Sequence, residues 1–277
     1  MGETPDHVRV VEEVLGIRNA PPALARRLVS QALVVGDRRD EWRKSGERIA
    51  ASAPDVPGVY VLRDVDGIAL YVGKASRLRR RLRAHFAPRR WRMIKPDLAR
   101  VAWAEWQEVG SEVEALVREA QWIRELAPIV NTQIGLPSIE TREIPRSILK
   151  DVVVLLPSYE ADSVELMAAC VDGPVMVQRT RRSGVDLAVH APRLWKFCTE
   201  RRERQAGLSP IVFSWLGQRG KDASRINVGD LANARELRAG LATLLSDPEL
   251  FAERIVVLNS KFRLTRRSAA RAKAEPV

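Results

Sequence analysis

The chain has 277 residues, of which 45% are hydrophobic and 29% are charged, and its formal net charge is +11. This length predicts two domains, and the apolar content is enough for ordinary cores, which excludes a globally disordered chain. No apolar run approaches the ~20 residues of a membrane-spanning helix, and the first residues do not form a secretory signal. The two cysteines, Cys170 and Cys198, lack metal-binding spacing, so we expect a reduced, cytoplasmic protein without structural zinc.

Residues 1–52 have the apolar spacing of helices. Val8, Val11 and Val14 share one helical face, and two consecutive prolines follow. We therefore expect an N-terminal helical segment made of short pieces.

A change to β-rich sequence follows at residue 57. The runs 58–62 and 68–72 are separated by Asp and Gly turn residues, which predicts a β-hairpin. Ser76 is expected to cap a helix that extends to Phe86. The alternating run 101–109 predicts a third strand.

The next predicted helix begins with a capping pattern, because Glu114 follows Ser111 by three positions, and Pro128 is expected to end it. Its apolar residues form one arc, and Glu114 is predicted on the opposite, polar side. Glu119 instead falls between Ile123 and Leu126. A carboxylate there is costly unless it reaches water, pairs with an arginine or binds a cation, and these alternatives stay open at this point.

The remainder of the chain is divided into a linker at 136–150, a mixed α/β domain of unknown role at 151–260, and a basic tail at 261–277. The tail is expected to contact phosphates non-specifically or only to aid solubility. The predicted elements of the domain are strands 151–156, 174–178 and 185–189, helix 194–205, strand 211–215, helices 231–245 and 248–254, and strand 255–258.

Most of the net charge is concentrated in residues 74–100, which contain eleven basic residues and one acid. Most of the basic residues are arginines, which bind phosphate oxygens bidentately, and aromatic residues stand among them. A solvated basic surface is the alternative, but this composition favours a nucleic-acid partner.

Two short motifs stand on the predicted hairpin, GVY at 58–60 and YVGK at 71–74. Four polar residues follow them on later elements: Arg81, His85, Glu119 and Asn131. In combination this array resembles the GIY-YIG nuclease superfamily, and it is most similar to the N-terminal nuclease domain of UvrC- and Cho-type excinucleases. The resemblance covers about residues 54–135.

The resemblance implies an α+β fold in which residues 53–135 form a three-stranded antiparallel sheet flanked by helices. It also implies metal-dependent hydrolysis of a DNA phosphodiester, with one Mg²⁺ or Mn²⁺ per active site. The implied DNA-binding residues are Arg77, Arg79, Arg80, Arg83, Arg89, Arg90, Arg92 and Lys95. DNA is thus the expected partner, and no membrane is expected.

The implied catalytic roles follow the family pattern. Glu119 would hold the cation, and Arg81 would donate to the phosphate. One of Tyr60 and Tyr71 would activate the attacking water; Tyr60 is favoured, but the two are not separated. A tyrosine with its reference pKa of ~10 must be activated by ~4 kcal/mol to act near neutral pH.

Supporting roles are implied for the remaining positions. Lys74 would help to stabilise the phenolate, His85 would relay the proton, and Asn131 would support the site by hydrogen bonding. Gly58 and Gly73 would be structural, with Gly73 allowing a close approach beside the tyrosines.

Three functional hypotheses follow. The first is an endonuclease acting in repair, in defence or on branched DNA, and the second is a non-catalytic DNA-binding module with the same fold. In the third, which is compatible with the first, the C-terminal half is an adaptor for a protein partner. Residues 151–277 lack a recognisable helical hairpin or second nuclease domain, so a complete excinuclease subunit is not expected.

Overall fold

The computed structural model describes residues 7–25, 27–29, 38–87, 96–134, 144, 147–160, 162–171, 173–200, 207–218 and 220–246. The chain divides into two compact units. The first unit contains residues 1–107 and 122–136, and the second contains residues 108–121 and 137–277. Each unit has its own sheet and core.

The first unit begins with helix α1 (His7–Leu15), whose Val11 packs with Ala20, Ala25 and Val29 in a small cluster. Helix α3 (Arg39–Ser52) follows and buries Trp42 and Ile49 in the main core of the unit.

The sheet of the first unit consists of β1 (Gly58–Arg63), β2 (Ala69–Ala75) and β3 (Trp103–Glu108), in the order β2-β1-β3. Strands β1 and β2 form the predicted hairpin. The start of β1 meets the end of β3, and the Ala102 N–H donates to the Arg63 carbonyl, so β3 also runs antiparallel to β1. The predicted three-stranded antiparallel sheet is confirmed.

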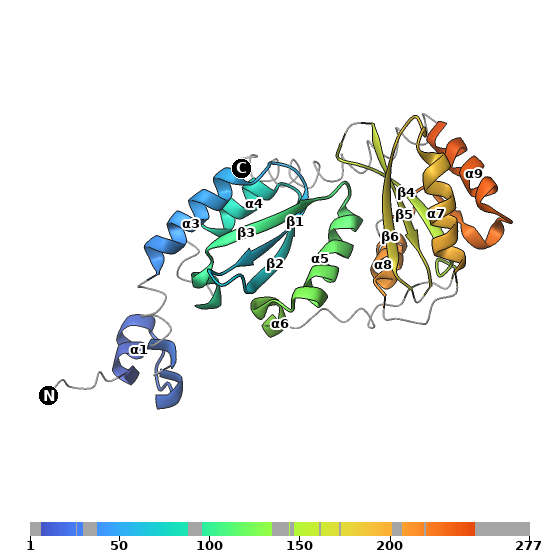
Figure 1. Cartoon of the computed structure of the whole chain (residues 1–277). Helices are drawn as coiled ribbons and strands as arrows, with labels where there is room; N and C mark the ends of the chain where they lie inside the picture. The colour runs from blue at the N-terminus through green and yellow to red at the C-terminus, as the bar shows by residue number, and fades with distance from the viewer. Residues whose placement is uncertain are drawn as a thin grey trace, which may run out of the picture. The chain divides into compact units, whose positions relative to one another are not determined.

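Helices α3 and α4 (Leu78–His85) pack together on this sheet (Figure 1). The rings of Trp42 and Phe86 lie 5.2 Å apart, and Leu78 and Leu82 pack in the same core as Tyr60. The last helix of the expected N-terminal segment thus shares a core with the sheet. The boundary placed at residue 52 stays a prediction.

A short 3-10 helix, η2 (Pro96–Arg100), precedes β3, and helices α5 (Glu112–Leu126) and α6 (Ile129–Ile134) follow it. Helix α5 ends before Pro128, as predicted, where Ala127 adopts a φ of 43°. The first ten residues of α5 belong to the second unit and its last five to the first unit.

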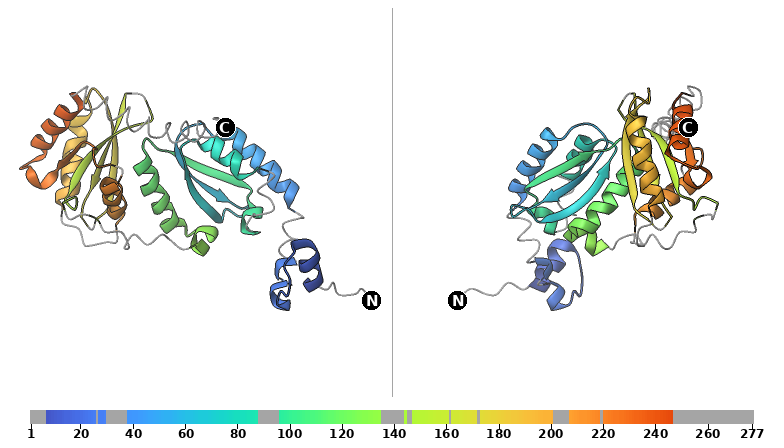
Figure 2. Two further views of the ribbon diagram at one scale, coloured as in Figure 1. Left: turned by 180° about the vertical axis from the view of Figure 1, so that it is seen from behind. Right: turned by 45° about the vertical axis from the view of Figure 1, so that its right-hand side comes forward.

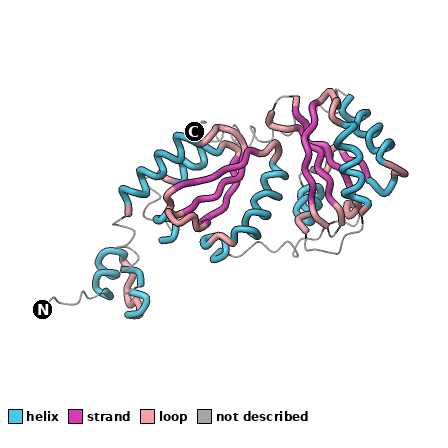
Figure 3. The backbone as a smooth tube through the Cα atoms, in the orientation of Figure 1, coloured by secondary structure: helices cyan, strands magenta, loops and turns pink. Residues whose placement is uncertain are grey.

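The second unit is built on a four-stranded antiparallel sheet in the order β6-β5-β4-β7. Figure 3 shows strands in magenta and helices in cyan. Helices lie on both of its faces (Figure 2). Its elements are β4 (Val152–Pro157), β5 (Ser163–Ala169), β6 (Val175–Arg181), α7 (Leu187–Thr199), α8 (Ser209–Gln218), β7 (Arg225–Asn227), η4 (Val228–Asp230) and α9 (Ala234–Ser246).

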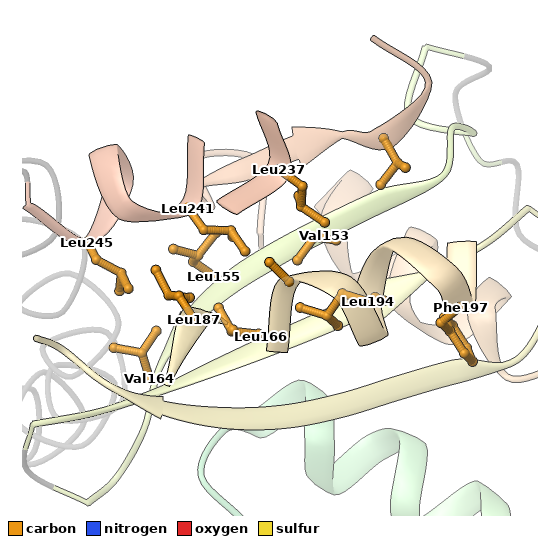
Figure 4. Close-up of a cluster of buried hydrophobic side chains, with 13 residues drawn as sticks. Val153, Leu155, Val164, Leu166, Leu187, Leu194, Phe197, Leu237, Leu241 and Leu245 are labelled. Atoms are coloured by element: carbon orange, nitrogen blue, oxygen red, sulfur yellow. The ribbon is translucent and has the colours of Figure 1, made fainter. Parts of the chain in front are cut away.

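Alternation along β4 and β5 divides the apolar residues of this sheet between two cores. On one face, Val153 and Leu166 pack against α7 and α9 (Figure 4). On the other face, Val154 and Met167 pack against α8 and the start of α5. The mixed α/β prediction for this region is therefore right at the level of fold class.

Several predicted elements are wrong. Residues 185–189 do not form a strand, because Gly184 turns the chain at a φ of 68° and helix α7 begins two residues after Val185. Strand β6 pairs instead with β5, which the sequence patterns did not reveal. Residues 211–215 form part of helix α8, since a short apolar run is equally compatible with a buried helix.

The predicted Ser76 cap is also wrong, because Arg77 is the N-cap residue of α4 and no side chain bonds to that helix end. The predictions for residues 248–258, for the tail, and for Arg89, Arg90, Arg92 and Lys95 lie outside the described residues. In the described part of the chain, no helix combines the length and apolar character needed to cross a bilayer.

Candidate active site

The two tyrosines of the hairpin share one face of the sheet. Tyr60 stands directly opposite Gly73, and Tyr71 precedes Gly73 by two residues, so the phenols are diagonal neighbours. A Cβ atom on residue 73 would lie 2.8 Å from the Tyr60 hydroxyl and 2.8 Å from Cε1 of Tyr71. Glycine is therefore required at this position for both rings to lie where they do.

His85 completes a group of three rings from three different elements. Its ring centroid lies 5.5 Å from that of Tyr71 and 6.4 Å from that of Tyr60, and the two phenol rings are 6.0 Å apart. Tyr60 is fully buried, whereas Tyr71 and His85 are half-buried. The strands and α4 thus bring the predicted tyrosine pair and histidine together.

Arg81 lies one helical turn before His85 on α4 and is exposed. The negative charge of an ionised Tyr60, together with its hydrogen bond to Arg81, raises the pKa of the Arg81 guanidinium above its ordinary value, and Tyr71 contributes in the same direction. A permanent cation therefore borders both phenols.

Asn131 on α6 holds the edge of the sheet beside these rings. Its Nδ2 donates to the Val72 carbonyl at 3.0 Å, and its Oδ1 accepts from the Val72 N–H at 2.8 Å. Since β2 is an edge strand, this side-chain amide takes the place of a missing strand partner. The residue between Tyr71 and Gly73 is thereby fixed by two hydrogen bonds.

The remaining hairpin residues have different positions. At Gly58 a Cβ atom would lie 2.5 Å from Leu78 Cδ1 and 2.7 Å from the Gln107 carbonyl oxygen, so this glycine permits close packing of α4 and β3 on β1. Lys74 follows Gly73 directly, and strand alternation places it on the opposite face from the phenols. The structure therefore does not group Lys74 with the tyrosines.

The described basic residues around α4 are in two situations. Arg79, Arg80 and Arg83 are exposed, although Arg79 Nε also donates to the Ala53 carbonyl at 2.7 Å. Arg77 pairs with Asp55, and its hydrogen bond lowers the pKa of that carboxyl. Arg77 is the N-cap residue that precedes the helix.

Glu119 is half-buried on α5. Within the described residues, no group of three or more His, Cys, Asp or Glu side chains is arranged to hold a metal ion. A site with a single protein carboxylate suits Mg²⁺, because this ion keeps several of its waters. It binds through one or two carboxylates and substrate phosphate rather than through a complete set of protein ligands. The donor set is thus compatible with a hydrated divalent cation at Glu119.

Glu114 contradicts its predicted place on the polar side of α5, because it is only 2% exposed. Its backbone N–H donates the predicted capping hydrogen bond to the Ser111 hydroxyl oxygen, at 3.2 Å. Its carboxylate accepts from the Gly110 N–H at 2.7 Å and pairs with Arg179 of β6 at 2.7 Å. The fully buried Glu165 of β5 belongs to the same cluster and was missed, although a lone acid within an apolar run could have signalled it.

The antiparallel sheet, the paired phenols and the arginine and histidine on the following helix define a GIY-YIG domain. Residues 56–132 match the family described as the UvrC-like GIY-YIG domain. This segment is therefore a UvrC-like GIY-YIG domain, as the sequence resemblance predicted.

Individual relatives agree with this assignment. The UvrABC system protein C of Beutenbergia cavernae is 43% identical over 86 residues, which is 29% of this chain and 12% of that protein. The protein of the same name from Mycobacterium tuberculosis is 45% identical over 87 residues, covering 30% of this chain and 13% of that protein. The chain thus spans about an eighth of the length of these curated relatives.

A solved structure also matches. It is the GIY-YIG N-terminal endonuclease domain of UvrC from Thermotoga maritima, bound to magnesium as its catalytic divalent cation. The sequence identity is 31%, the match covers 31% of this chain and 94% of that chain, and the TM-score is 0.27.

Proposed function

We propose that this protein is an endonuclease that hydrolyses phosphodiester bonds in DNA with the help of a divalent cation, and that it acts in DNA repair. The main support is the convergence of two phenols, one histidine and one arginine around Gly73. The match to a UvrC-like domain supports DNA as the substrate and repair as the setting.

The base that activates the attacking water is one of the two tyrosines. The sequence favoured Tyr60, but Tyr60 is fully buried, whereas Tyr71 is half-buried and has access to solvent. A general base must come within hydrogen-bonding reach of the water that it deprotonates. We therefore assign Tyr71 as the base and Tyr60 as the residue that orients Arg81.

Arg81 is proposed to hold a non-bridging phosphate oxygen as negative charge develops in the transition state. Its exposure leaves the guanidinium available to DNA, and its coupling to both phenols fixes its place. Glu119 is proposed to hold one Mg²⁺ or Mn²⁺. The cation would polarise the phosphoryl oxygen and stabilise the leaving oxygen.

Supporting residues complete the proposal. His85 takes the proton from Tyr71, its neighbour in the ring group, and passes it to solvent. Asn131 fixes the strand between the reacting tyrosine and Gly73. Lys74 contributes positive charge from the other face of β2, and its catalytic role stays a prediction.

The DNA is proposed to lie along the exposed arginines of α4, Arg79, Arg80 and Arg83. Arg77 contributes less, because Asp55 already pairs with it. The predicted contacts of Arg89, Arg90, Arg92 and Lys95, and a protein partner for the C-terminal domain, stay part of the proposal.

A panel of labelled DNA substrates tests this function: intact, nicked, flapped, damaged and branched duplexes, each incubated with Mn²⁺, with Mg²⁺ or with EDTA. We expect cleavage of one strand of at least one substrate with either metal and none with EDTA. Binding to every substrate without cleavage of any would identify a non-catalytic DNA-binding module instead.

A further inference from the structure

The second unit contains two buried carboxyl groups, bridged by an exposed arginine, outside the candidate active site. Glu114 of α5 is 2% exposed and Glu165 of β5 is 0% exposed. Arg179 of β6 bridges them, with its Nη2 atom 2.7 Å from Glu114 Oε2 and 3.6 Å from Glu165 Oε1. Helix α5 therefore meets the paired strands β5 and β6 at this point.

The loop before α5 closes tightly over the cluster. A Cβ atom on Gly110 would lie 2.0 Å from Glu165 Oε1 and 2.5 Å from the Ser158 hydroxyl. The Gly110 carbonyl accepts from the Tyr159 N–H at 2.7 Å, and the Gly110 N–H donates to Glu114. This segment of backbone is thus bonded to the C-terminal sheet on one side and to the first turn of α5 on the other.

The two carboxyl groups of the cluster lie close together, and their pKa values move in opposite directions. Burial, with Glu114 as a hydrogen-bonded and charged neighbour, raises the pKa of Glu165 to about 9. Burial alone would raise the pKa of Glu114 as well, but hydrogen bonds from Glu165 and Gly110 and the charge of Arg179 hold it below its ordinary value. Arg118 also faces Glu114, at 4.0 Å. Near neutral pH, Glu165 is therefore a neutral donor and Glu114 a paired carboxylate.

Apolar packing reinforces the same attachment. Val113 and Val117 of α5 are buried in the core that β4, β5 and α8 form. Glu119 follows Glu114 by five residues, or about 7.5 Å along the helix axis. Its backbone therefore belongs to a helical segment that an ion pair and apolar packing both attach to the C-terminal sheet.

We infer that the cluster of Glu114, Glu165 and Arg179 positions helix α5, so that the C-terminal domain sets the place of the carboxylate of Glu119. These are positioning residues and do not touch the substrate. The inference rests on the proposed function, because it takes Glu119 to be the residue that holds the cation. It gives the C-terminal domain a structural role in holding the helix that carries Glu119, in addition to any role in recruiting a partner.

The test compares Glu165→Gln with Glu165→Leu, because the amide keeps a neutral donor of the same shape while the leucine removes it. Arg179→Met is a second disrupting variant. Arg181→Met is its matched control, because Arg181 lies two residues further on the same strand and is exposed. Two properties of the full chain are measured: hydrogen exchange of amides 112–121, and the dissociation constant for Mn²⁺ from the electron paramagnetic resonance of the free ion.

We expect Glu165→Leu and Arg179→Met to speed exchange in α5 about tenfold and to weaken Mn²⁺ binding by about tenfold or more. Glu165→Gln and Arg181→Met should stay within about twofold of wild type in both measurements. Unchanged exchange in both disrupting variants would refute the attachment of α5 by this cluster. Faster exchange with unchanged Mn²⁺ binding would refute its positioning role.

Failure of the proposed function gives a different result. If the wild-type protein neither binds Mn²⁺ nor cuts any DNA, the cation site at Glu119 is wrong, and the positioning of a metal ligand is refuted with it. Hydrogen exchange would still decide, independently of metal and activity, whether the cluster holds α5.

Discussion

Gly73 governs the geometry of the candidate site at the scale of single residues. Any side chain there would press against the Tyr60 hydroxyl and the ring of Tyr71, both 2.8 Å from the position of a Cβ atom. Tyr60 is fully buried, so its ring has little room to move away.

We therefore predict that Gly73→Ala lowers the rate of DNA nicking by about 100-fold, because a shift of about 1 Å at reacting groups has an effect of that order. The rate is measured on supercoiled plasmid with Mn²⁺. Gly229→Ala is the control, since no atom lies within 4 Å of its added Cβ, and it should keep the wild-type rate. A fully active Gly73→Ala variant would contradict the placement of both phenols at the reacting centre.

The two tyrosines differ in exposure, and this difference predicts different effects of removing their hydroxyl groups. Tyr71→Phe should lower the nicking rate by about 10²- to 10⁴-fold, the usual contribution of a general base. Tyr60→Phe should have a smaller effect, because it removes only the partner of Arg81. Single-turnover nicking rates distinguish the two variants. A larger loss of rate in Tyr60→Phe than in Tyr71→Phe would make Tyr60 the general base and contradict the assignment of Tyr71.

At the scale of elements, the stability that the attachment of α5 to β5 and β6 contributes depends on pH. Glu165 keeps its proton in the folded protein up to about pH 9, whereas the unfolded chain releases it near the ordinary value for glutamate. Between these values the folded state binds more protons than the unfolded state, so a rise in pH lowers the free energy of unfolding. Groups facing Glu165 in this cluster are Glu114, Arg179 and the hydroxyl of Ser111.

We predict that the free energy of unfolding of the wild-type protein falls relative to that of Glu165→Gln between about pH 5 and pH 8, by at most about 1.4 kcal/mol per pH unit. Glutamine does not titrate and lacks this dependence. Urea unfolding of both proteins at several pH values measures the difference. Parallel pH profiles would show that Glu165 is not a buried neutral acid.

The contribution of Glu114 to the free energy of unfolding changes with pH in the opposite direction. Its pKa is lower in the folded protein than its ordinary value, so its stabilising contribution is present above that value and is lost as the pH falls further. The cluster is therefore most stabilising in mildly acidic solution.

For the whole molecule, local sequence patterns were sufficient to predict the nuclease-like sheet. The β-rich runs around a Gly-containing turn predicted the β1–β2 hairpin, and the run beginning near Val101 predicted β3. The tyrosine, arginine and histidine positions were proposed from the family resemblance, and local patterns placed them on the hairpin and the following helix. Their convergence followed from the family resemblance rather than from spacing.

Non-local packing explains what the sequence did not predict. Glu114 was assigned to the polar side of α5 because one apolar arc was considered, yet its carboxylate is buried and pairs with Arg179 of β6. The short run 211–215 has an apolar composition that strands and buried helices share. Strand β5 contains the acidic Glu165, whose partners lie on the adjacent strand β6 and on α5, which is far away in sequence.

The two units share helix α5, and this predicts the effect of removing the C-terminal half. A chain truncated after residue 134 exposes Val113 and Val117, which is expected to reduce stability by about 3–6 kcal/mol. We expect thermal unfolding at a lower temperature and a reduced nicking rate. Full activity with only substrate selectivity lost would instead favour a purely recruiting role for the C-terminal domain.

The central claim is that Glu119 holds the cation for hydrolysis while the arginines of α4 bind the DNA. The most direct measurement compares wild type, Glu119→Gln and Arg81→Ala for nicking of supercoiled plasmid in Mn²⁺ and for DNA affinity in a gel shift. We predict that both variants lose nicking by about 1,000-fold or more, while Glu119→Gln binds DNA within about twofold of wild type. Nicking by Glu119→Gln at the wild-type rate would contradict the account.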